Sequence, residues 1–262
     1  MKLSISNIAW THDDDYSMYK MLSERNISGL EIAPTRIWKD TPYEHIEEAK
    51  NFANMLLMEY GLEISSMQSI WFGITENIFT SEESRQRLIE YTKKAIDFAN
   101  VIKCGNLVFG CPRNRKMEVT NNEEEVYNFF KTIGDYAFEQ QTRVALEANP
   151  AIYNTNFINT TNEALAFVKK IDSKGLLVNY DLGTCIVNGE SLVALEEDME
   201  YLNHIHISEP NLELIKKRKI HNAIAEILKT NKYNGYVSLE MKMQDNKNVI
   251  IDSIEYLREV FQ

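Results

Sequence analysis

Four predicted strands in the second half of the chain each end at or near a side chain that could bind a metal. RVALE ends at Glu147, LLVNYD at Asp181 and YVSLE at Glu240, while NHIHIS carries His206. Three carboxylates and one imidazole suit a single divalent cation, and this oxygen-rich set favours Mn²⁺, Mg²⁺ or Co²⁺ over thiolate-binding metals. Zn²⁺ stays in the candidate set. The chemistry depends on whether the fold brings these four side chains together.

The remaining sequence predicts the elements that must position them. Apolar alternation predicts eight strands, at 2–9, 28–34, 62–69, 105–110, 143–147, 176–181, 203–208 and 236–240. Three-to-four spacing predicts a helix after each strand, at 13–25, 43–60, about 80–102, about 122–140, 161–171, 191–199, 220–230 and 248–261. Eight such units without an internal linker predict an α/β fold, a (β/α)₈ TIM barrel, with residues 1–262 as a single domain.

A doubly wound open sheet is the alternative fold. It is disfavoured because the first strand runs into AWTHDDD, without the glycine-rich phosphate turn of dinucleotide-binding sheets. Two helix ends are also marked in the sequence. Gly61 stands where a helix C-terminal glycine belongs, and Thr80 or Ser81 can cap the third long helix.

Strand alternation predicts where the four candidate ligands point. In RVALE, Glu147 lies on the face opposite to Val144 and Leu146, and the other three ligands oppose their apolar neighbours in the same way. All four therefore point into the barrel. They also lie at or near the carboxyl ends of their strands, where barrel enzymes keep their active sites. Because strands five to eight are neighbours, we expect the four side chains to converge, and a cation would offset the repulsion between their charges.

Composition disfavours several classes of function. With 28 Lys+Arg against 39 Asp+Glu, the formal charge of −11 disfavours nucleic-acid binding, which depends on cations that contact phosphates. No apolar run approaches the length of a membrane span, and the start MKLSISNIAW lacks the pattern of a signal peptide, so we expect a cytoplasmic protein without a membrane partner. Cys104, Cys111 and Cys185 show no CxxC spacing, which predicts no disulfide framework. The oligomeric state is open, a homo-oligomer being one option.

The motifs LEANP, NYDLGT, HIHISEP and SLEMK, in this order at consecutive strand ends, resemble the sugar-phosphate isomerase/epimerase group of xylose-isomerase-like TIM barrels. That group includes ketose 3-epimerases, hydroxypyruvate isomerases and inosose dehydratases. The resemblance implies that Glu147, Asp181, His206 and Glu240 bind one divalent metal, and that Glu147 and Glu240 also act as acid/base catalysts. It implies a metal-dependent isomerase or epimerase that removes a proton next to a metal-bound carbonyl of a small sugar or sugar derivative.

Two positions depart from the group's pattern. Its epimerases carry a histidine three residues after the aspartate ligand, where this chain has Thr184 after Asp181. They carry an arginine six residues after the histidine ligand, where this chain has Leu212 after His206. Both positions contact substrate in those relatives. The departures therefore question a simple free-ketose epimerase, although they leave the metal site intact.

Further residues are candidates for substrate binding. They are Trp10, His12, Gln68, Trp71, Arg113, Arg115, Tyr153, Asn156, Glu209 and Lys242. Trp10 and Trp71 could form an apolar floor against a sugar face. Arg113 and Arg115 could bind a phosphate or carboxylate, and Lys242 could contact an anionic substrate. The polar residues, with Glu31 as a further one, could form hydrogen bonds to hydroxyl groups.

Three other functions stay open at this point. A dehydratase of the inosose or dehydroshikimate type would begin with the same proton abstraction. A non-catalytic sugar-binding barrel would explain the two departures from the pattern. A nuclease like endonuclease IV shares the barrel but needs additional histidine ligands, and the five histidines and the acidic charge oppose it.

Overall fold

Eight parallel strands close into a barrel in the order of the chain, which confirms the predicted (β/α)₈ fold. The computed structural model describes residues 1–117 and 123–262. The strands are β1 Lys2–Ser6, β2 Gly29–Ile32, β3 Glu63–Met67, β4 Leu107–Phe109, β5 Val144–Glu147, β6 Leu176–Asp181, β7 Leu202–Ser208 and β8 Tyr236–Glu240. β1 pairs with both β2 and β8, so the sheet has no free edge strand.

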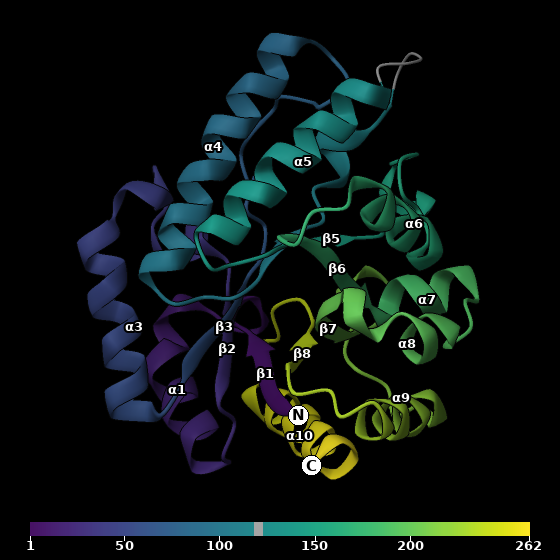
Figure 1. Ribbon diagram of the computed structural model, residues 1–262. Helices are drawn as coiled ribbons and strands as arrows, with labels where there is room; N and C mark the ends of the chain where they lie inside the picture. The colour runs from purple at the N-terminus through teal and green to yellow at the C-terminus, as the bar shows by residue number, and fades with distance from the viewer. Residues whose placement is uncertain (118–122) are drawn as a thin grey trace.

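The helices form an outer layer around the strands (Figure 1). They are α1 Asp15–Glu24, α2 Pro34–Ile37, α3 Ile46–Tyr60, α4 Glu82–Val101, α5 Glu123–Glu139, α6 Thr161–Ile171, α7 Leu182–Asn188, α8 Val193–Glu197, α9 Lys219–Thr230 and α10 Lys247–Phe261. Residue 122, where the fourth predicted helix begins, lies outside the described residues. Among the described residues, no helix has both the length and the apolar character needed to cross a membrane.

The helix ends follow the local sequence. Gly61 ends α3 in the left-handed conformation, with φ of 68°, as predicted for a C-terminal glycine. Ser81 caps α4, because its side chain accepts a hydrogen bond from the backbone N–H of Ser84; Thr80 does not take this role. The short helix α7 was not predicted. It begins directly after β6, where LGTCIV reads as a loop.

The strands separate an apolar layer from a polar barrel interior. Val144 and Leu146 of β5 are fully buried in the hydrophobic core. Polar residues of other strands meet inside the barrel: the hydroxyl groups of Ser4 and Ser65 are 2.6 Å apart, and Glu31 of β2 contacts His206 of β7. Period-two alternation therefore directs polar side chains to the barrel axis, where they can build a site.

Candidate metal centre

The imidazole of His206 lies at the centre of the four predicted ligands. Its Nδ1 is 3.2 Å from Oε2 of Glu147, 3.1 Å from Oε2 of Glu240 and 4.0 Å from Oδ2 of Asp181. The register of the parallel strands places Asp181 beside His206. The prediction that the four side chains from strands five to eight converge at the carboxyl end of the barrel is confirmed.

Local hydrogen bonds fix two of the carboxylates. Asp181 accepts from the backbone N–H of Thr184 at 2.6 Å, because it is the N-cap of α7, and from the hydroxyl of Ser208 at 2.5 Å. Glu147 accepts from the side-chain amides of Asn149 at 3.0 Å and Asn179 at 2.7 Å. The side chains are thus held in place before any ligand binds.

The other nitrogen of His206 faces the opposite way, into the barrel. Its Nε2 lies 2.9 Å from Oε2 of Glu31, and Nε2 of His204 lies 3.0 Å from the same oxygen. Gln68 donates from its amide to the second oxygen of Glu31 at 3.2 Å. Glu31 and the two histidines are at most 1% exposed, so this cluster is shut off from solvent.

Burial and crowding shift the protonation of the site. Burial raises the pKa of Glu240 to about 7, against the opposing effect of the nearby His206 imidazole. Burial, together with the charge on Glu147, raises the pKa of Asp181 as well. Burial disfavours the charged form of His206, but Glu31, Glu240 and Glu147 outweigh it and hold the pKa of this imidazole well above its usual value. Without a metal, the site therefore retains protons near neutral pH.

These residues fit a divalent cation. Ligand atoms of Glu147, Asp181 and His206 lie within 4.8 Å of one another, and Glu240 approaches the same nitrogen of His206. Within residues 1–117 and 123–262, no lysine or arginine pairs with the three carboxylates, so one imidazole faces three acids. A divalent cation held by these residues would supply the missing positive charge.

A cavity of about 440 Å³ opens beside this cluster. Its described lining comprises Gln68, Ser69, Val108, Gly110, Cys111, Pro112, Glu147, Asn149, Tyr153, Asp181, Ser208, Glu209, Asn211, Leu212 and Glu240. Three of the four predicted ligands are among these residues. Leu212, which stands where the group's epimerases have an arginine, lines the cavity, whereas the hydroxyl of Thr184 is turned to the carbonyl of Ala148.

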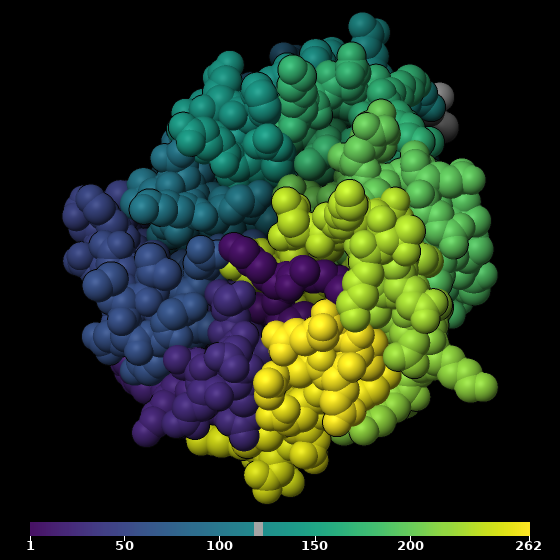
Figure 2. Space-filling model, turned by 60° about the horizontal axis from the view of Figure 1, so that its bottom comes forward, coloured from purple at the N-terminus to yellow at the C-terminus, as the bar shows by residue number. Residues whose placement is uncertain are grey.

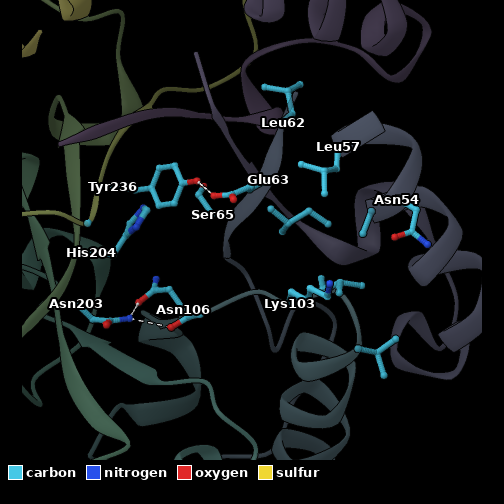
Figure 3. Close-up of a pocket in the computed structure, with 16 residues that line it drawn as sticks. Asn54, Leu57, Leu62, Glu63, Ser65, Lys103, Asn106, Asn203, His204 and Tyr236 are labelled. Carbon is cyan, nitrogen blue, oxygen red and sulfur yellow. Dashed lines mark hydrogen bonds between the residues drawn. The ribbon is translucent and has the colours of Figure 1, made fainter. Parts of the chain in front are cut away.

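A second cavity, of about 430 Å³, lies at the amino-terminal end of the barrel. Figure 2 shows this side of the molecule, with the N-terminal residues in the middle of the ring of helices. His204 and Tyr236 line the cavity from one side, and Asn54 and Leu57 of α3 line it from the other (Figure 3). None of the four predicted ligands lines it. Three of the predicted ligands line the cavity at the carboxyl end instead.

Three of the predicted substrate-binding residues line the cavity at the carboxyl end: Gln68, Tyr153 and Glu209. The hydroxyl of Tyr153 accepts a hydrogen bond from the backbone N–H of Asn211 at 2.8 Å. Glu209 is buried, and its carboxylate is paired with Arg218 at 2.6 Å. Their roles in substrate binding stay predictions.

Four others lie away from this cavity. Trp10 is buried and donates its indole N–H to Asp15, so it is a core residue and not an apolar floor. Trp71 is likewise buried and donates to Thr92. His12 is exposed and pairs with Asp15 at 2.8 Å. Asn156 bonds through its amide to the backbone of Met117, which ties two loops together.

The three basic residues that were predicted to bind an anion also lie outside the cavity lining. Arg115 is fully buried and donates to the backbone carbonyl of Glu147 and to the side chain of Asn149, both at 2.7 Å. Burial lowers the pKa of Arg115 to about 10, which leaves it charged at neutral pH. Arg113 is exposed, and Lys242 pairs with Glu213. None of these three is among the described residues that line the cavity.

Sequence reasoning missed the residues that hold the ligands. Asn149 and Ser208 each stand two positions after a ligand, and Asn179 stands two positions before one. This spacing is the signal that could have found them, because residues two apart in an extended segment share a face. Glu31 was predicted to bind hydroxyl groups, but its carboxylate faces His204 and His206.

Comparison with known proteins agrees with the fold. A family model described as a xylose isomerase-like TIM barrel matches residues 20–260. Comparison with curated protein sequences gives no match.

Several solved structures are similar over the whole chain. One is 3-keto-D-glucoside 4-epimerase, YcjR, from E. coli, with 20% identity, a TM-score of 0.79 and 99% of each chain covered. Another is D-psicose 3-epimerase from Clostridium cellulolyticum H10, solved with D-tagatose, with 16% identity, a TM-score of 0.80 and 100% of each chain covered. A family 2 AP endonuclease from Brucella melitensis has 18% identity, a TM-score of 0.71 and 94% of this chain and 95% of its own covered. At these identities the likeness concerns the fold.

Proposed function

The chain belongs to the xylose isomerase-like TIM barrel family, and on that premise we propose that it is a divalent-metal-dependent isomerase or epimerase of an uncharged sugar or sugar derivative. The observation that carries the proposal is the convergence of Glu147, Asp181 and Glu240 on one nitrogen of His206. Two of the similar solved structures are sugar epimerases, which supports the same class of reaction.

Glu147 and Glu240 would hold the metal and also move the proton. A divalent cation held by the four residues would polarise a substrate carbonyl and so acidify the neighbouring C–H. Glu147 and Glu240 come from β5 and β8, on the two sides of His206, and both line the cavity. One carboxylate can remove the proton, and the other can return it on the other face of the substrate, which gives epimerisation. Return on a neighbouring atom gives isomerisation.

The environments of the two glutamates differ in a way that suits this exchange. Two amide donors fix both oxygens of Glu147. Glu240 is more buried, lies 3.1 Å from Nδ1 of His206, and has a pKa raised to about 7 by burial in the metal-free protein.

The lining of the cavity supports an uncharged substrate. Its described residues include four acids, Glu147, Asp181, Glu209 and Glu240, but no lysine or arginine. Arg115 is turned to the backbone carbonyl of Glu147 and to Asn149, and Arg218 is paired with Glu209, so neither arginine is placed to bind a phosphate group in this cavity. Neutral side chains such as Tyr153 offer hydrogen bonds to hydroxyl groups instead.

A solvent-exchange experiment tests this proposal. Metal-loaded protein is incubated in D₂O with neutral ketoses, their phosphate esters, keto acids and inososes, and NMR follows the proton next to the carbonyl. We expect exchange with at least one neutral compound and none with its phosphate ester. Glu147→Gln or Glu240→Gln should slow the exchange by about 10²- to 10⁴-fold, because each removes a positioned base.

Glu139→Gln, on the exposed side of α5, is the matched control and should exchange at the wild-type rate. Mass spectrometry of the products separates the alternatives, since loss of water would identify a dehydratase. Folded, metal-loaded protein that exchanges no proton in any compound would contradict the proposal and favour a non-catalytic sugar-binding barrel.

A further inference from the structure

We infer that Glu31 is a positioning residue for the metal centre: its carboxylate holds the His206 imidazole in the orientation and tautomer that present Nδ1 to the metal. The inference rests on the proposed metal centre and adds a residue from the opposite side of the barrel. Glu31 belongs to β2, whereas the four proposed ligands belong to β5 to β8.

The two nitrogens of His206 have separate partners. Nδ1 faces Glu147 and Glu240 at 3.2 Å and 3.1 Å, whereas Nε2 lies 2.9 Å from Glu31. An imidazole that donates its Nε2 proton to Glu31 leaves the lone pair of Nδ1 free for a cation. The negative charge of the acceptor also makes Nδ1 a stronger donor of electrons to the metal.

The structure fixes Glu31 itself. Gln68 donates to one carboxylate oxygen, and its amide also lies 2.5 Å from the hydroxyl of Ser6. Nε2 of His204 lies 3.0 Å from the other oxygen, the one that faces His206. Glu31 is fully buried, and a carboxylate in such a place costs free energy unless partners hold it. His204 lines the amino-terminal cavity of Figure 3, whereas Glu31 is not among its lining residues.

Metal binding to variants tests this role without relying on activity. Glu31→Gln retains the shape and one acceptor oxygen but loses the charge, and Glu31→Met removes both acceptors. Titration calorimetry of metal-free protein with Mn²⁺ should show affinity weakened by about 10- to 100-fold, with Glu31→Met the weaker of the two. Ser4→Ala, which removes a hydrogen bond elsewhere in the barrel interior, should bind like the wild type.

The tautomer gives a second readout that a merely structural role would not move. In Mg²⁺-loaded wild-type protein, ¹⁵N NMR should find the proton of His206 on Nε2 and slow to exchange with solvent. In Glu31→Met this exchange should accelerate, because the proton has lost its acceptor.

Glu31 variants that are folded, bind Mn²⁺ within about twofold of the wild type and keep the Nε2 signal would overturn the inference. If Glu31→Met fails to fold, the Mn²⁺ affinity of Glu31→Gln alone tests the inference. A wild-type chain that binds no Mn²⁺ would contradict the proposed metal centre itself. That outcome is distinct from a failure of the role of Glu31, which needs a wild type that binds the metal.

Discussion

His206 contacts acidic residues on both sides of its imidazole. Its imidazole is fully buried and meets Glu147 and Glu240, which line the cavity, on one side and the fully buried Glu31 on the other. Low dielectric surroundings strengthen each of these charge interactions. The protonation of the site and its occupancy by metal are therefore coupled, since a proton and a cation compete for the same atoms.

The pKa of Glu240 predicts a pH dependence of metal binding. Its carboxyl group has a pKa raised to about 7 by burial, so it keeps its proton below that pH, and a metal must displace this proton. Below pH 7, Mn²⁺ affinity should fall by about tenfold per pH unit for this proton alone. Glu240→Gln should bind more weakly at pH 8 but with a shallower pH dependence between pH 8 and 6. Equal slopes in calorimetric titrations of the two proteins would contradict the assignment.

At the scale of elements, the ends of helices and strands set the geometry. Asp181 ends β6 and caps α7, so one carboxylate both starts a helix and faces the cluster. The 3₁₀ turn Pro112–Arg115 after β4 brings Arg115 inward, where it bonds to the carbonyl of Glu147. The short elements after the strands therefore support the ligands as much as the strands do.

The cap of α4 gives a prediction for stability with a control in the neighbouring residue. Ser81→Ala removes the acceptor for the backbone N–H of Ser84 and should lower the free energy of unfolding by about 1 kcal/mol. Thr80→Ala should change it little, because Thr80 is exposed and does not cap the helix. Urea unfolding of both variants measures the difference. A larger loss for Thr80→Ala would show that the cap is misassigned.

At the scale of the whole molecule, a closed barrel brings distant segments to one point. Ligands from β5 to β8 meet Glu31 of β2 across the interior, which only a closed sheet allows. The polar interior also separates two cavities, one at each end of the barrel. The contacts of Glu31 with His204 and with His206 connect the two ends of the interior.

Strand periodicity was enough to predict the barrel and the convergence of the four proposed ligands, because alternation fixes which face a side chain occupies. The partners of the charged side chains could not be predicted in this way. Glu209 pairs with Arg218 and Lys242 with Glu213, and these pairs depend on how loops fold back onto one another. Trp10 is likewise held in the core by the hydrogen bond that its indole N–H donates to Asp15. Local spacing contains no information about such contacts.

If the four strand ends hold one divalent ion, the metal content of the purified protein will depend on His206. Wild-type protein and His206→Ala are equilibrated with Mn²⁺, dialysed, and measured for metal per chain, with circular dichroism to establish that both are folded. We expect about one ion per wild-type chain and almost none in His206→Ala, since the variant loses the nitrogen on which three carboxylates converge. Equal metal content in the two folded proteins, or none in the wild type, would contradict it.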